Sequence, residues 1–146
     1  NLRLGVGKDA DNLYITCKVK DGELYSGGQG TQKGSGVFIY LDTKNECLKE
    51  PAEGVYKVWC SYKGDITVWQ GNKGKWENSE LEGLQITPSV VPGGYELAFT
   101  IPLNRSFNKD TMRLCATLST KTYTETLVHS NADWSCTWMK MNLGGH

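Results

Sequence analysis

The sequence predicts an all-β fold, a jelly-roll-like β-sandwich of two antiparallel sheets, from two observations. Short stretches of alternating apolar and polar side chains follow one another along the chain, and none has the period of an amphipathic helix. Seventeen glycines, seven tyrosines and five tryptophans suit strands joined by tight turns. Because 146 residues are enough for one core and too few for two, we expect a single domain over residues 1–146.

The first long strands are predicted at residues 12–20 and 36–42, and the polar segment 21–35 between them is expected to form a long surface loop. In 36–42 one face of the strand is aliphatic, whereas Phe38 and Tyr40 lie on the other face. Two aromatic residues on the nominally outer face indicate that this face is not plain solvent.

The stretch 54–76, GVYKVWCSYKGDITVWQGNKGKW, predicts a hairpin with its turn at 63–65 and holds three of the five tryptophans. One face of its first strand carries tyrosine, valine and cysteine, while the other face places Trp59 beside Lys57. A tryptophan in that position is either covered by other parts of the protein or offered to a flat, partly apolar partner.

Further strands are predicted at 84–91, 95–101, 112–118, 123–128 and 138–143, which gives about eight to ten strands in all. The five cysteines are an odd number without metal-type spacing, so disulfides are compatible with the sequence but not implied. Those on strand faces shared with apolar neighbours are expected to act as small hydrophobic residues.

The charges balance, with 16 basic and 16 acidic side chains. We therefore expect neither nucleic acid nor an anionic membrane as a partner, since both favour a basic surplus. No apolar run approaches the length of a membrane span. The chain opens on an alternating segment rather than a signal peptide, and we interpret it as part of a longer protein.

Six segments succeed one another along the chain: NLYITCKVKD, GVFIYLD, GVYKVW, GGYELAFTIPL, MRLCATLS and, after a tryptophan, WMKMNL. Their order and spacing, from Leu2 to Leu143, resemble the family 9 carbohydrate-binding modules and their wider DOMON-like relatives. The resemblance implies a β-sandwich that binds sugars without catalysis. It also implies attachment to a secreted glycoside hydrolase or another enzyme that degrades plant-wall polysaccharides, and members of the family often hold structural calcium.

In that family a sugar lies between aromatic rings from loops, above polar side chains of one sheet. Trp134 matches the family's late loop tryptophan. The positions that match the ligand side of the sheet are Phe38, Tyr40, Lys57, Trp59, Arg113 and Cys115. The family's other clamping tryptophan is missing, because that place reads Lys-Gly-Ser with Gln32 nearby. The missing tryptophan favours a flat aromatic platform that binds the side of a glycan chain over two rings that grip the end of the chain.

Such a platform needs rings and hydrogen-bonding groups together. The axial C–H groups of a pyranose stack on indole, and its hydroxyls favour planar or charged partners. We therefore expect Trp59 and Trp134 to be displayed for stacking, and Lys57 and Arg113 to bind hydroxyls. The further candidates for ligand binding are Phe38, Tyr40, Trp69, Trp76, Gln32 and Tyr25. Trp69 and Trp76 either extend the platform or pack against each other, Tyr25 could replace the missing ring, and Trp138 is expected in the core.

Asp9, Asp11, Asp21 and Asp42 lie near predicted strand ends, where carboxylates could gather with backbone carbonyls around a structural calcium ion. Turn and cap roles are the commoner explanation for single aspartates. No other cofactor is required.

Two other classes of protein stay open. A heme domain would need axial ligands, for which His129 with Met112, Met139 or Met141 could serve, although methionines in alternating strands more often fill a core. A structural or protein-interaction spacer of a multimodular surface protein is the second alternative. Catalysis is poorly supported, since a histidine-based triad would depend on His129 and no nucleophile elbow is present.

The sequence therefore predicts a secreted, non-catalytic carbohydrate-binding module that is covalently linked to other modules of a larger protein. Its expected ligand is a plant cell-wall polysaccharide of the β-glucan or cellulose, xylan or mannan type. A uronic acid polymer such as pectin is also compatible with Lys57 and Arg113.

Overall fold

The computed structural model describes residues 2–26, 34–120, 124–126, 135 and 138–143. These residues form eleven strands and no α-helix, so none of them belongs to a helix able to span a membrane. The strands are β1 (Leu2–Lys8), β2 (Asn12–Lys20), β3 (Gly36–Asp42), β4 (Val55–Ser61), β5 (Ile66–Asn72), β6 (Lys75–Asn78), β7 (Gln85–Val91), β8 (Gly94–Pro102), β9 (Thr111–Ser119), β10 (Thr124–Thr126) and β11 (Met139–Asn142).

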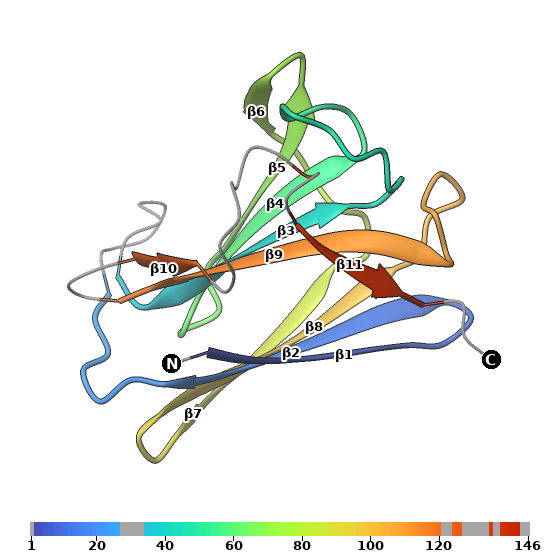
Figure 1. Ribbon diagram of the computed structural model, residues 1–146. Helices are drawn as coiled ribbons and strands as arrows, with labels where there is room; N and C mark the ends of the chain where they lie inside the picture. The colour runs from blue at the N-terminus through green and yellow to red at the C-terminus, as the bar shows by residue number, and fades with distance from the viewer. Residues whose placement is uncertain (1, 27–33, 121–123, 127–134, 136–137, 144–146) are drawn as a thin grey trace.

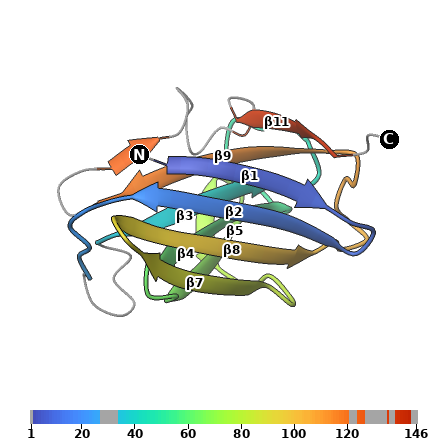
Figure 2. The same cartoon turned by 90° about the horizontal axis from the view of Figure 1, so that it is seen from below.

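The strands form two antiparallel sheets that pack face to face (Figure 1). The smaller sheet has the order β1-β2-β8-β7, and Figure 2 shows these four strands side by side across the larger sheet. The larger sheet has the order β10-β9-β3-β4-β5-β6, with β11 also paired to β9. β10 pairs with residues 117–119 of β9 and β11 pairs with residues 111–114, so both lie along the edge of β9 opposite β3. The predicted all-β sandwich is confirmed.

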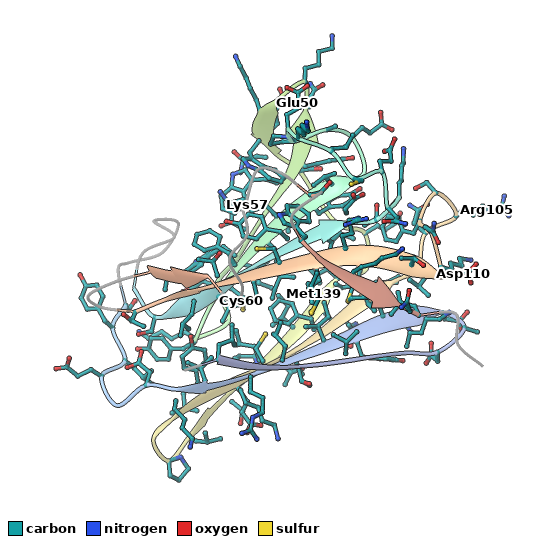
Figure 3. The ribbon with its side chains drawn as sticks, in the orientation of Figure 1. Glu50, Lys57, Cys60, Arg105, Asp110 and Met139 are labelled. Carbon is teal, nitrogen blue, oxygen red and sulfur yellow. The ribbon has the colours of Figure 1, made fainter. Side chains whose placement is uncertain are left out.

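The core lies between the sheets because alternate residues of the central strands point into it. Leu13 and Ile15 of β2 and Val37 and Ile39 of β3 have no exposed surface and belong to one apolar cluster. Cys60 of β4 joins the same cluster, and Figure 3 places it between the two sheets. The strands predicted at 12–20 and 36–42 are confirmed with the same bounds.

The stretch 54–76 contributes to three strands rather than to a two-stranded hairpin. β4 and β5 form the predicted pair around the turn at 63–65. β5 then pairs with β6 through Lys73 and Gly74, which both have positive φ. Two left-handed residues are what a two-residue hairpin turn requires. The larger sheet thereby gains an edge strand that carries Trp76.

The cysteines divide into two kinds. Cys47 is disulfide-bonded, whereas Cys17, Cys60 and Cys115 are buried thiols. Burial raises the pKa of Cys17 and of Cys60 to about 12, and the neighbouring Cys60 adds to the shift of Cys17. Cys17 and Cys60 pack in the main core, which is the small hydrophobic role expected of them.

The methionines of the heme alternative are placed by the pairing of β9 with β11. Met112 and Met141 are cross-strand neighbours, and both pack in the main core. Met139 is exposed, and His129 lies outside the described residues. Two of the three candidate methionines are therefore core residues, which argues against their serving as axial ligands.

We expect Cys17 and Cys60 to resist alkylation in the native protein. With a pKa near 12, only about one thiol in 10⁴ is ionised at about pH 8, and the thiolate is the reactive form. In urea both cysteines should react fully, because unfolding returns the thiols to water. Peptide mapping by mass spectrometry after iodoacetamide treatment measures each site, and fast labelling of either residue without urea would contradict a closed core.

Candidate functional site

The face of the larger sheet that turns away from the smaller sheet carries a group of aromatic rings placed by strand register. Tyr40 of β3 is the cross-strand partner of Lys57 in β4, and Lys57 is in turn the partner of Trp69 in β5. Phe38 shares this face two residues before Tyr40, and Trp76 joins it from β6 opposite Gly71. We call the rings of Phe38, Tyr40, Trp69 and Trp76 the aromatic cage.

The ammonium group of Lys57 lies inside the aromatic cage. Its Nζ atom is 4.7 Å from the ring centroid of Trp69, 5.2 Å from that of Phe38, 5.8 Å from that of Trp76 and 5.9 Å from that of Tyr40. All four distances are within the range at which a ring face attracts a cation, and one such contact is worth about 0.5–2 kcal/mol. The rings together hold the ammonium on this face of the sheet, where Figure 3 shows Lys57.

The cage rings also contact one another and leave part of their surface exposed. Phe38 lies 6.2 Å from Tyr40 and 6.3 Å from Trp69, and Tyr40 lies 6.0 Å from Trp76, measured between ring centroids. Tyr40 is buried, whereas Phe38, Lys57, Trp69 and Trp76 are half-buried. The face therefore presents apolar ring surface next to a positively charged hydrogen-bond donor.

Trp59 is on the same face, but its predicted display to solvent is wrong. Its side chain is only 3% exposed, and its ring centroid lies 4.8 Å from that of Phe38. The indole fills the space over Gly36, where an added Cβ would collide with it. Alternation assigned Trp59 to the correct face, but the missing side chain at Gly36 lets the ring sink and Phe38 covers it. Trp59 therefore supports the cage and does not offer a stacking surface.

A second cluster of buried residues supports the cage on its β9 side. Its members are Tyr40, Val55, Cys115 and Trp138, and the residues packed against it are Phe38, Leu48 and Trp76. Trp138 is 3% exposed, with its ring centroid 5.8 Å from that of Tyr40. Trp138 is therefore buried as predicted, but in this second cluster and not between the sheets.

Residues 43–53 form a loop that brings Leu48 to the second cluster. The buried carboxylate of Asp42 accepts the N–H groups of Glu46 and Cys47, at 3.2 and 3.0 Å, and so caps the start of the loop. The N–H of Leu48 donates to Ser135 Oγ at 2.6 Å. Asp42 thus acts as the cap that single aspartates commonly provide.

Arg113 lies next to the 43–53 loop, at one side of the aromatic cage. Its Nε donates to Asn45 Oδ1 at 2.9 Å, and its cross-strand partner in β3 is Asp42. Along β9 it is two residues from Cys115, the partner of Tyr40. The structure gives Arg113 a role in holding the 43–53 loop, and its bond to a sugar hydroxyl remains a prediction.

The four aspartates predicted as calcium ligands do not converge on one point. Asp9 and Asp11 lie at one end of β2 and Asp21 lies at the other, which is about 30 Å away along a nine-residue strand. Asp9 accepts the Tyr14 hydroxyl at 2.6 Å, and this bond, followed by two backbone N–H groups, lowers the pKa of Asp9. Across the described residues, no group of three acidic, cysteine or histidine side chains could hold a metal ion. Structural calcium therefore remains a prediction, without these four aspartates as one ligand set.

The remaining candidates lie in or near the loops. Tyr25 is 45% exposed and sits beside the start of β3, because its carbonyl accepts the N–H of Ser35 at 2.7 Å. Trp134 and Gln32 lie outside the described residues. The roles of Tyr25, Trp134 and Gln32 in ligand binding remain predictions.

Two features of the site were not found by sequence reasoning, namely the enclosure of Lys57 by four rings and the contribution of Leu48. The first has a signal in the sequence, since antiparallel pairing of GVFIYLD with GVYKVW can place Tyr40 opposite Lys57. The second has none, because a single leucine in a polar loop carries no pattern.

Comparison with known proteins links this fold to sugar-binding modules. No protein-family model matches the sequence, and no curated protein matches it significantly. Two similar solved structures are of a carbohydrate-binding module of family 9 from Caldicellulosiruptor kristjanssonii. One, in complex with cellotriose, matches the whole chain over 76% of its own length, with a TM-score of 0.81 and 15% identity. The other, in complex with glucose, matches the whole chain over 78% of its own length, with a TM-score of 0.80 and 15% identity. The chain therefore has the fold of family 9 carbohydrate-binding modules, as the resemblance predicted.

We expect Trp59→Ala to lower the free energy of unfolding by about 3–5 kcal/mol, because it leaves a large cavity between Gly36 and Phe38. Trp69→Ala removes the same atoms from a half-buried position, so it should lower the free energy of unfolding by clearly less than Trp59→Ala does. Urea denaturation of the two variants measures the difference. Equal stability of Trp59→Ala and the unchanged protein would contradict the buried placement of Trp59.

Proposed function

We propose that this chain is a carbohydrate-binding module whose cage face binds a plant cell-wall polysaccharide of the β-glucan or cellulose, xylan or mannan type. The observation that carries the proposal is the Lys57 ammonium set among four rings, of which Trp69 and Trp76 are half-exposed indoles. An indole face takes the C–H surface of a pyranose, and an ammonium group has three N–H donors for hydroxyls. A neutral sugar requires both kinds of contact in one place.

The layout of the rings favours binding along the side of a glycan. Trp69 and Trp76 belong to the adjacent strands β5 and β6 at the open edge of the larger sheet. Neighbouring strands are about 4.8 Å apart, so a polysaccharide that crosses them meets both indoles and Lys57 in succession. The ligands of the two similar structures, cellotriose and glucose, make glucose-based polymers the first to test.

The proposal extends to the setting of the module. We infer that it performs no catalysis, is appended to a polysaccharide-degrading enzyme and is secreted. The disulfide at Cys47 supports an oxidising compartment, because cytosolic proteins seldom keep structural disulfides. Structural calcium belongs to the same proposal and is tested by running each assay with calcium and with a chelator.

The experiment is affinity electrophoresis on hydroxyethylcellulose, barley β-glucan, xyloglucan, xylan, glucomannan and pectin. We expect retardation on one or two of the neutral polymers. Trp69→Ala and Trp76→Ala should each weaken binding about tenfold, which corresponds to about 1.4 kcal/mol for the loss of one stacking face. Titration calorimetry with the best polymer measures that loss.

Tyr14→Ala is the matched control, since it removes an exposed ring from the smaller sheet, away from the cage. It should bind like the unchanged protein. Normal binding by both tryptophan variants would place the sugar site elsewhere. A chain that is retarded by none of the polymers, with or without calcium, would instead support a spacer or protein-interaction domain.

A further inference from the structure

The aromatic cage has the geometry with which proteins recognise ammonium ligands, but here the ammonium belongs to the chain itself. Rings from β3, β5 and β6 surround the Nζ of Lys57 at 4.7–5.9 Å from their centroids. Quaternary ammonium ligands are bound in such cages because ring faces carry partial negative charge. Lys57 therefore occupies the position that an external cation would take.

The side chain of Lys57 has little freedom to leave this position. On the sheet its cross-strand neighbours are Tyr40 and Trp69, and its same-face neighbours along β4 are Val55 and Trp59. Val55, Trp59 and Tyr40 are buried. The stem of Lys57 therefore has a side chain on each of its four sides within the sheet face, and its ammonium group lies among the rings.

We propose that Lys57 is a specificity-determining residue, which fills the cage with positive charge and so excludes cationic amino-sugar glycans while admitting neutral ones. This inference rests on the proposed function and deepens it, since it names a class of sugar that the site rejects. A protonated amine brought onto the same rings would lie next to Nζ, because both cations would contact the same ring faces. Two like charges about 5 Å apart near a protein surface repel strongly enough to weaken binding at least tenfold.

The test uses two trisaccharides of matched length, cellotriose and fully deacetylated chitotriose, which differ at carbon 2 by a hydroxyl or an amine. The pH is kept low enough for the amines to be protonated. Titration calorimetry should show the unchanged protein binding cellotriose at least tenfold more tightly than chitotriose. Lys57→Met fills the same volume without charge, and its preference should fall to within about threefold. An unchanged protein that already binds both sugars equally would overturn the proposal.

A second arm probes the cage itself without any sugar. Lys57→Ala removes the ammonium group from the cage, so this variant should bind choline at least tenfold more tightly than the neutral isostere 3,3-dimethyl-1-butanol. Binding of each compound is measured by the change in tryptophan fluorescence. Lys57→Met and the unchanged protein should bind neither. Equal binding of choline and its isostere by Lys57→Ala would overturn the cage assignment.

The two arms separate this inference from the proposed function. If the unchanged protein binds no polysaccharide, the proposed function fails, and choline binding by Lys57→Ala still supports Lys57 as the occupant of a cation cage. If Lys57→Ala does not fold, as judged by its thermal transition, the comparison of Lys57→Met with the unchanged protein decides the matter on the two trisaccharides.

Discussion

The register of β3, β4 and β5 is the constraint on which the rest of the site depends. On one face of these strands it aligns Tyr40, Lys57 and Trp69, and on the other it aligns Ile39, Val58 and Val68. A slip of one residue would turn Lys57 into the core and Val58 out of it. Because burial of the apolar row fixes the register, the same free energy that forms the core also assembles the cage around the lysine.

The cage depends equally on segments far from it in sequence. Leu48 reaches the second cluster from the 43–53 loop, and Trp138 reaches it from the position just before β11. At the far end of the loop, Pro51 and Ala52 pack on Gly71, where any side chain would collide with their backbone. The aromatic cage is thus held in place by strand pairing within the larger sheet and by tertiary packing around its margin.

Much of the fold could be predicted because strand alternation is local. The bounds of β2 and β3 follow from alternation and from the glycine and polar residues that flank them. The exposure of Trp59 could not be predicted, since alternation assigns a face but says nothing of what covers it. Gly36 and Phe38 decide that, and they contact Trp59 only once β3 and β4 are paired.

The candidate site was predicted as a set of residues but not as an arrangement. Phe38, Tyr40, Lys57 and Trp69 were all candidates, yet each was assigned to stacking or hydrogen bonding separately. Their common contact is with one ammonium group, and it forms only when β3, β4 and β5 pair in the register that places Lys57 between Tyr40 and Trp69. The aspartates illustrate the opposite case, because Asp21 lies at the other end of β2 from Asp9 and Asp11, so the four cannot act as one set.

The pairing of β11 with β9 has a consequence for the order of events during synthesis. The ribosome releases β3 to β6 well before residues 138–143, yet Trp138 completes the second cluster with Tyr40 and Cys115, and β11 pairs with β9. A nascent chain can therefore pair most of the strands of its two sheets before Trp138 joins the second cluster beneath the cage. The cage face is therefore completed last, when Trp138 packs against Tyr40 and β11 pairs with β9, although most of the sheet pairing is already in place by then.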